Sequence, residues 1–303
     1  MRLLVLGAGG FLGGHIAGRL RALPGVRLLT GGRHPADDLR VDLATAPPRA
    51  LAHLIGLAAP DAVVNCAGAV GGSALTLVEA NSRGPAVLCE ALREAAPAAR
   101  LVHLGSAAEY GPAVLGEQTP EEAPARPVCV YGASKLAGTL AVTGSGLDSV
   151  VLRVTDVVGP GAGRAGLPGR LTAELREAVR HGRSGPLRVA DASAHRDFVD
   201  VRDVATAAAL ALTAHGPLPP LLNIGSGRAV AVRELAHGLL RVSGYRGRLE
   251  PAPGASGEAT AVPWRCVRIT AARRELGWRP VHTLHASLTA LWSADGAPGR
   301  EPR

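Results

Sequence analysis

The first fourteen residues constrain the fold more than any other stretch of this chain. An apolar run, Leu3–Leu6, leads into a glycine-rich segment, residues 7–14, and a helical pattern of apolar residues follows. This order predicts a strand, a tight turn and a helix, in which Gly7, Gly10 and Gly13 let the backbone approach a pyrophosphate at the helix N-terminus. The G-x-x-G-x-x-G spacing differs from the G-x-G-x-x-G fingerprint, so the pattern needs support from the rest of the chain.

Strand and helix patterns then alternate along the first half of the sequence. Short apolar runs at 26–30, 62–66 and 100–104 are separated by amphipathic stretches at 49–57 and 85–95. Such alternation predicts an α/β fold with a doubly wound parallel sheet of the Rossmann type, which binds ligands at the carboxyl ends of its strands. A chain of 303 residues is long enough for this domain and a smaller C-terminal substrate lobe.

The domain boundaries follow from where the alternation weakens. We expect a dinucleotide-binding Rossmann domain over residues 1–158, which the chain rejoins over about 198–227. Residues 159–197 and 228–292 are expected to form the substrate lobe. The final stretch, 293–303, is rich in glycine, proline and charge, and we expect it to be disordered.

Lys135 is the only lysine in the sequence, since every other residue in the Lys+Arg total of 33 is an arginine. It lies four residues after Tyr131 in a stretch with a helical pattern, so the two side chains share one helix face. An ammonium beside a phenol favours the phenolate and lowers the tyrosine pKa from about 10 toward neutral pH. Such a pair can exchange a proton with an alcohol or ketone oxygen. Because a bare Tyr-x-x-x-Lys pattern is common in amphipathic helices, its meaning depends on the surrounding motifs.

The short segment that follows the second predicted strand, residues 31–34, bears on the choice of dinucleotide. An acid in that position typically holds the ribose hydroxyls of NAD, whereas an arginine accommodates the 2′-phosphate of NADP. The sequence has Arg33 there. NADP is therefore the expected cofactor, and NAD is the alternative.

Composition argues against several other partners. The formal charge is +8, but the arginines are scattered and aromatic residues are few, so we expect no nucleic-acid partner. The apolar runs are much shorter than the ~18 residues of a membrane span, so we expect no membrane partner. The four cysteines are too widely separated for a metal or redox pair, which favours a cytoplasmic protein.

Motifs over nearly the whole chain resemble the extended short-chain dehydrogenases/reductases, the NAD-dependent epimerases and dehydratases that act on nucleotide sugars. The motifs that carry the resemblance are residues 7–13, Asp42-Leu43, 81–84, Ser106 with Tyr110-Gly111, 131–135, Arg153 with 159–161, 196–204, 223–227 and 275–280. The resemblance implies a nucleotide-sugar substrate and a nicotinamide cofactor. We also expect a homodimer.

The resemblance implies a role for each matching residue. Tyr131 would be the acid/base, Lys135 would hold the nicotinamide ribose and lower the tyrosine pKa, and Ser106 would hydrogen-bond the reacting oxygen of the substrate. Together with Arg33, the implied cofactor-binding residues are Gly7, Gly10, Phe11, Leu12, Gly13, Asp42, Leu43, Cys66, Ala67, Gly68, Tyr131 and Lys135.

Two departures from the family pattern bear on the reaction and on substrate binding. Ala107 and Ala108 stand where the family's dehydratases have an Asp-Glu pair that supplies the acid and base for water elimination. Dehydration is therefore disfavoured. Asp156 replaces the family's asparagine, which puts a substrate contact of that amide in doubt.

The substrate diphosphate needs a cationic partner, and Arg196 is the best-supported candidate. A salt bridge from Arg196 to Asp197 or Asp203 is an equally weighted structural explanation. The family often has a further arginine near the C-terminus for the same diphosphate. Arg265 or Arg268 could fill that place, and the sequence does not choose between them.

Three functions remain open. The first is an NADPH-dependent 4-ketoreductase of a nucleotide-linked 4-keto-6-deoxyhexose, the second is a 4-epimerase that retains NAD, and the third is a non-catalytic dinucleotide-binding regulatory protein. The presence of Ser106, Tyr131 and Lys135 argues against the third function. Arg33 favours the first over the second.

Overall fold

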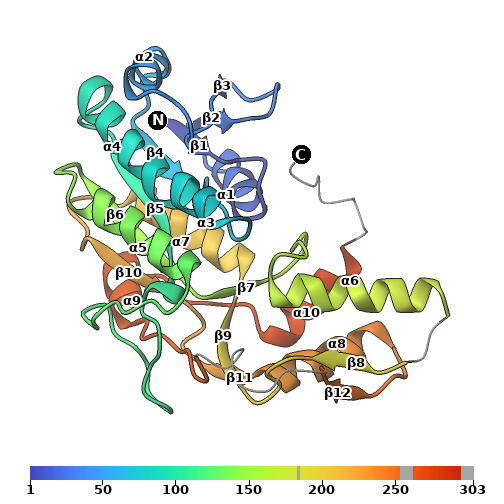
Figure 1. Cartoon of the computed structure of the whole chain (residues 1–303). Coiled ribbons are helices and arrows are strands. Elements are labelled where there is room, and N and C mark those ends of the chain that lie inside the picture. Colours follow the sequence, from blue (N-terminus) through green and yellow to red (C-terminus); the bar gives the residue numbers. More distant parts are fainter. Residues whose placement is uncertain (183–184, 253–261, 295–303) are drawn as a thin grey trace.

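The centre of the molecule is a seven-stranded parallel sheet with the strand order β10-β6-β5-β4-β1-β2-β3 (Figure 1). The computed structural model describes residues 1–182, 185–252 and 262–294. The strands of this sheet are β1 (Arg2–Leu6), β2 (Arg27–Gly32), β3 (Leu39–Arg40), β4 (Ala62–Asn65), β5 (Arg100–Ser106), β6 (Ser149–Val154) and β10 (Leu221–Ile224). The predicted α/β fold with a doubly wound parallel sheet is confirmed.

Helices cover both faces of the sheet because successive residues of a strand point to opposite sides. In β1, Leu3 and Val5 pack in one apolar core, whereas Leu4 and Leu6 pack in the other. The helices of the first face are α1 (Phe11–Arg21) and α7 (Val201–Thr213), and those of the second are α2 (Pro48–Ala58), α4 (Gly84–Ala95) and α5 (Val130–Thr143). The short helices α3 (Ala74–Val78) and η1 (Glu79–Arg83) precede α4, and the turn η2 (Ala107–Glu109) follows β5.

The strand order reverses at β1, which lies between β4 and β2. At such a switch point the two halves of the sheet diverge and leave a crevice beyond the carboxyl ends of the strands. The strands β1, β4 and β5 end at Leu6, Asn65 and Ser106. The turns that follow these residues therefore share one edge of the sheet.

A smaller lobe lies beside this domain, at the lower right of Figure 1. Its strands β7 (Asp156–Val158), β9 (His195–Asp200) and β11 (Ala229–Ala231) form one sheet, and β8 (Leu187–Val189) pairs with β12 (Leu249–Pro251). Its helices are α6 (Leu167–Arg180), α8 (Val232–Ser243) and α10 (Leu284–Ser293). Apolar side chains from all three helices meet in one core.

The segment 228–292 was expected to lie wholly in the lobe, but the structure divides it. Val267, Ile269 and Trp278 pack in the core of the parallel sheet, because α9 (Thr270–Leu276) lies against α7 and β10. The strand β7 pairs with residues 198–200 of β9, and both segments were expected in the first domain. They belong to the small sheet β11-β9-β7 and not to the seven-stranded sheet.

The chain's last described helix, α10, includes Ser293 of the predicted disordered tail. Residues 295–303 of that tail lie outside the described residues. Among the helices that the structure describes, none combines the length and the apolar character needed to cross a lipid bilayer.

Candidate active site

The turn between β1 and α1 is held by close backbone packing. Gly7 has a φ of +80°, and a Cβ there would lie 2.8 Å from the backbone nitrogen of Ala67. A Cβ on Gly13 would overlap the carbonyl oxygen of Gly7. The N-cap of α1, Gly10, makes no side-chain capping bond, and the first turn carries no acid. The free N–H groups at this helix end therefore suit a pyrophosphate.

The other residues expected to bind the cofactor lie around this turn. Phe11 begins α1, and its ring is nearly perpendicular to the His15 ring at a centroid distance of 5.7 Å. Arg33 directly follows β2 and is exposed. After β3, Asp42 accepts a hydrogen bond from the Ala44 N–H (3.0 Å), and the side chain of Leu43 is buried. Leu12 is partly buried against the core.

The turn after β4 brings the expected residues Cys66, Ala67 and Gly68 close to α5. A Cβ on Gly68 would lie 2.8 Å from Asn81 Oδ1 and 3.8 Å from Lys135 Nζ. Asn81 is buried, and its amide exchanges two hydrogen bonds with the backbone of residue 69 and donates a third to residue 134 (3.1 Å). No role was expected for this asparagine. Asn81 opens the 81–84 motif, and this motif is the sequence signal that could have identified it as a residue of the site.

The structure brings Ser106, Tyr131 and Lys135 together where β5 ends and α5 begins. The Ser106 side chain lies close enough to the phenol of Tyr131 to lower its pKa. One turn further along α5, Lys135 is almost fully buried, and its ammonium donates a hydrogen bond of 2.5 Å to the carbonyl oxygen of Leu104 in β5. The hydroxyl, the phenol and the ammonium thus occupy one edge of the sheet.

The pKa of Tyr131 departs from the sequence-based expectation. Burial raises it above its ordinary value, the side chain of Ser106 opposes this effect, and the negative charge of Glu109 adds to it. The prediction of a lowered tyrosine pKa is wrong for the chain by itself, because burial disfavours the phenolate. The ammonium of Lys135 is bound to the Leu104 carbonyl, and burial lowers its own pKa.

One arginine and one carboxylate, Arg265 and Asp156, lie near enough to Tyr131 to act on its pKa, and Arg196 neighbours Arg265. Arg265 Nη1 lies 3.1 Å from Asp156 Oδ2, while Arg265 Nε is buried without a hydrogen-bond acceptor among the described residues. Burial lowers the pKa of Arg196, and the neighbouring charge of Arg265 lowers it further, so the two guanidinium groups are close. Asp156 and Arg265 both act on the pKa of Tyr131. Arg268, the other C-terminal candidate, is exposed.

The salt bridges considered for Arg196 are not formed. Asp197 instead accepts hydrogen bonds from the backbone N–H and the hydroxyl of Ser226, both at 2.6 Å. Asp203 pairs with the His282 ring at 2.8 Å. Among the residues that the structure describes, no carboxylate lies within ion-pair distance of Arg196. Within the described parts of the chain, its guanidinium donates a hydrogen bond only to the backbone carbonyl of His195, at 3.0 Å.

A buried ion pair lies behind Ser106. Ala107 and Ala108 are both buried in η2, so that turn offers no carboxylate to a substrate from these positions. The third residue of the turn, Glu109, is fully buried and pairs with Arg153 of β6 at 2.7 Å. Sequence reasoning missed Glu109, although its place three residues after a serine is a capping-box pattern.

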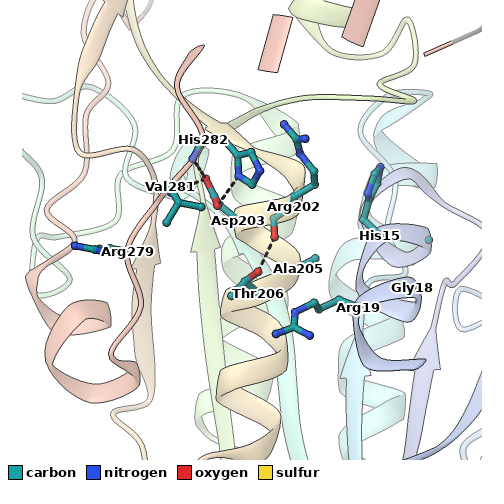
Figure 2. Close-up of a pocket in the computed structure, with 11 residues that line it drawn as sticks. His15, Gly18, Arg19, Arg202, Asp203, Ala205, Thr206, Arg279, Val281 and His282 are labelled. Carbon is teal, nitrogen blue, oxygen red and sulfur yellow. Dashed lines mark hydrogen bonds and ion pairs between the residues drawn. The ribbon is translucent and has the colours of Figure 1, made fainter. Parts of the chain in front are cut away.

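A separate pocket of about 410 Å³ lies between α1, α7 and residues 279–282 (Figure 2). Its lining contains several cationic side chains but none of the three expected catalytic residues. Two of its basic side chains already have partners, Arg202 with Asp200 at 2.8 Å and His282 with Asp203. The candidate active site is therefore identified by converging side chains and not by the size of a cavity.

The chain belongs to the NAD dependent epimerase/dehydratase family, whose sequence profile matches residues 3–225. This places it among the extended short-chain dehydrogenases/reductases that act on nucleotide sugars, as its motifs indicated. The protein is an NAD(P)-dependent oxidoreductase/epimerase of that type.

Particular relatives are similar along nearly their whole length. The dTDP-6-deoxy-L-talose 4-dehydrogenase (NAD(P)(+)) of Kitasatospora kifunensis is 36% identical over 303 aligned residues, covering 97% of this chain and 95% of the relative. The structure of RMD from Pseudomonas aeruginosa complexed with NADPH has a TM-score of 0.82 and 25% identity, covering 97% of this chain and 98% of that one. MoeE5 in complex with UDP-glucuronic acid and NAD has a TM-score of 0.83 and 25% identity, covering 96% and 98%.

Proposed function

We propose that this protein is an NADPH-dependent 4-ketoreductase of a nucleotide-linked 4-keto-6-deoxyhexose. The observation that carries the proposal is the group Ser106, Tyr131 and Lys135 beside a turn whose dehydratase positions are alanines. These residues support proton exchange at a carbonyl oxygen without water elimination. The Kitasatospora relative is named for 4-dehydrogenation of a 6-deoxy sugar, and that oxidation and the proposed reduction are opposite directions of one type of reaction.

The residues divide the reduction between them. NADPH, when bound, supplies the hydride that reaches the carbonyl carbon, and the ketone becomes a secondary alcohol. Tyr131 donates the proton to the oxygen, and its raised pKa keeps the phenol protonated and ready to donate near neutral pH. Ser106, whose side chain lies near that phenol, orients the oxygen toward it. Lys135, beside the Gly68 turn, would hold the nicotinamide ribose.

Arg196 and Arg265 support binding of the substrate's diphosphate. Two neighbouring guanidinium groups repel each other unless an anion lies near them, and Asp156 neutralises only part of their charge. The Nε of Arg265, which has no acceptor in the part of the chain that the structure describes, is an available donor. Arginine is well suited to bidentate contacts with phosphate oxygens. We therefore assign both residues to the substrate, with Arg265 added to the arginine expected from the sequence.

NADP is the proposed cofactor, on the grounds of Arg33. The side chain is exposed where β2 ends, which is the place for an adenosine 2′-phosphate in this fold. Gly7 and Gly13 fit the pyrophosphate because they keep the N-terminus of α1 open. The relatives include one named for NAD(P)(+), one complexed with NADPH and one complexed with NAD.

We also propose a cytoplasmic homodimer. Large apolar side chains are exposed on the neighbouring helices α3 and α5, among them Leu75 (65% exposed), Val78 (46%) and Leu140 (61%). Covering such a face with a second copy removes apolar surface from water. Sedimentation should give the dimer mass for the unmodified protein and the monomer mass for Leu140→Glu; a monomeric unmodified protein contradicts the proposal. The four free cysteines suit a reducing compartment.

The experiment that tests the proposed reaction follows the cofactor. An epimerase regenerates NAD within each cycle, whereas a reductase consumes one NADPH per turnover and must exchange it. The purified protein should therefore release little dinucleotide on denaturation, and it should oxidise added NADPH only when a nucleotide-linked 4-keto-6-deoxyhexose is present. Stoichiometric NAD in the denatured sample, with interconversion of two nucleotide hexoses and no added cofactor, would establish the epimerase instead. Dinucleotide binding without turnover of either substrate class would favour the regulatory protein.

A further inference from the structure

Glu109 is a fully buried carboxylate that the proposed reaction does not use directly. It ends the turn η2, three residues after Ser106. Burying an ionised carboxylate is costly unless hydrogen bonds and an opposite charge replace its hydration. The partners of Glu109 therefore indicate what the residue does.

Both carboxylate oxygens of Glu109 have a partner at the end of the sheet. Oε1 accepts a hydrogen bond from the backbone N–H of Ser106 at 2.7 Å, and Oε2 accepts one from Arg153 Nε at 2.7 Å. A Cβ on Gly105 would lie 2.8 Å from Oε1, so the carboxylate is seated directly on the backbone of β5. The guanidinium of Arg153 in turn lies 4.4 Å from the ring centre of Tyr110.

The same turn is pressed against the start of α5. A Cβ on Gly132 would lie 2.5 Å from the carbonyl oxygen of Ala108, so the glycine after Tyr131 allows the helix and the turn to touch. The Ser106 hydroxyl accepts the Ala108 N–H at 3.2 Å. Glu109 therefore holds, through one backbone N–H, the turn that sets the position of the serine relative to the tyrosine.

We propose that Glu109, paired with Arg153, is a positioning residue that fixes Ser106 against Tyr131 and sets the charge balance around Tyr131 and Lys135. This inference rests on the proposed function, because it concerns the same three residues. The charge of Glu109 shifts the pKa values of Lys135 and Tyr131 in a definite direction. The negative charge of Glu109 raises the pKa of Lys135 against the lowering effect of burial, and it adds to the raised pKa of Tyr131.

The test replaces the charge and keeps the shape. Glu109→Gln retains an acceptor for the Ser106 N–H but leaves Arg153 unbalanced, so the phenol of Tyr131 should ionise more easily. The pH limb on which the reductase kcat falls should move about one pH unit toward acid. Asp148→Asn is the matched control, because it breaks an arginine ion pair of 2.9 Å at the other end of β5 and should leave the limb unmoved.

A double variant tests the positioning role of Glu109. It also keeps the proposal testable if the Glu109→Gln protein does not fold. Glu109→Leu with Arg153→Met replaces the buried pair by apolar side chains, an exchange that proteins often tolerate. We expect kcat to fall at least tenfold, while the substrate KM and the NADPH Kd stay within twofold and the pH limb returns toward its original place. The inference is overturned if the double variant keeps its kcat within twofold, or if the limb does not move in Glu109→Gln or moves equally in Asp148→Asn.

Failure of the proposed function can be told apart from failure of this inference. If the unmodified protein turns over no keto-sugar, the charge effect is measured without substrate. The chain has three tyrosines, so the ultraviolet phenolate absorbance of Tyr131 is the difference between a protein and its Tyr131→Phe variant. In the Glu109→Gln background this titration should move to lower pH. An unchanged titration overturns the inference independently of any activity.

Discussion

Gly13→Ala should disrupt the turn that opens the cofactor site, and its effect can be worked out from the packing. The added Cβ would overlap the carbonyl oxygen of Gly7 and lie 2.7 Å from that carbonyl carbon and 3.0 Å from the Cα of Ala8. All three atoms belong to the backbone, so no side chain can move aside. Either α1 or the turn must shift.

The expected loss of stability is the difference between two opposing effects. Overpacking of this kind lowers the free energy of unfolding by up to about 3 kcal/mol. Replacing a helical glycine by alanine raises it by about 1 kcal/mol. The net loss is then about 2 kcal/mol. With an unfolding entropy of about 2.1 cal/mol/K per residue for the 303 residues, Tm should fall by roughly 3 °C.

The assay combines thermal unfolding with NADPH binding. A shift of the N-terminus of α1 moves its free N–H groups, so the Kd for NADPH should rise at least tenfold, which corresponds to about 1.4 kcal/mol. Gly18→Ala is the matched control, since it lies on the same helix and a Cβ there meets no described atom within 4 Å beyond the backbone of its own helix. It should raise Tm slightly and leave the Kd unchanged. A Gly13→Ala protein that melts and binds NADPH like the unmodified protein would refute the reasoning.

Three further predictions concern other parts of the molecule. Tyr131→Phe and Lys135→Ala should each lower kcat by about 10²–10⁴-fold in folded protein, and near-normal turnover in Tyr131→Phe would contradict the catalytic assignment. Arg33→Ala should erase most of the difference in Kd between NADPH and NADH, a difference that the unmodified protein must show. Burial raises the pKa of Asp200, but hydrogen bonds from Arg202 outweigh it and leave the pKa below its ordinary value. Asp200→Asn should therefore cost about 2 kcal/mol in urea unfolding at pH 7, and the deficit should shrink as pH falls below the unfolded pKa of about 4; an equal deficit at pH 3 would exclude this origin.

The order of the secondary structure could be predicted because its causes are local. Apolar runs of strand length, the glycine turn and the amphipathic helical stretches all lie within short windows of sequence. The pairing of Tyr131 with Lys135 could also be predicted, because a separation of four residues places two side chains on one helix face. The division of residues 228–292 between the lobe and the core of the parallel sheet could not be predicted. Whether an apolar segment such as Val267 to Trp278 completes one core or another depends on which surface it meets in three dimensions.

The electrostatic properties of the site came only from the tertiary structure. The sequence places a phenol near an ammonium, which by itself favours the phenolate, but burial of Tyr131 raises its pKa instead. Arg265, Asp156 and Arg196 belong to three separate segments, and the small lobe sheet and its neighbouring turn bring them near one another. The sequence by itself determined the family, the sheet and the three expected catalytic residues, because motifs and periodicity are written along the chain. The burial of those residues, the partner of Glu109 and the choice of Arg265 over Arg268 depended on contacts between distant segments, which only the folded chain defines.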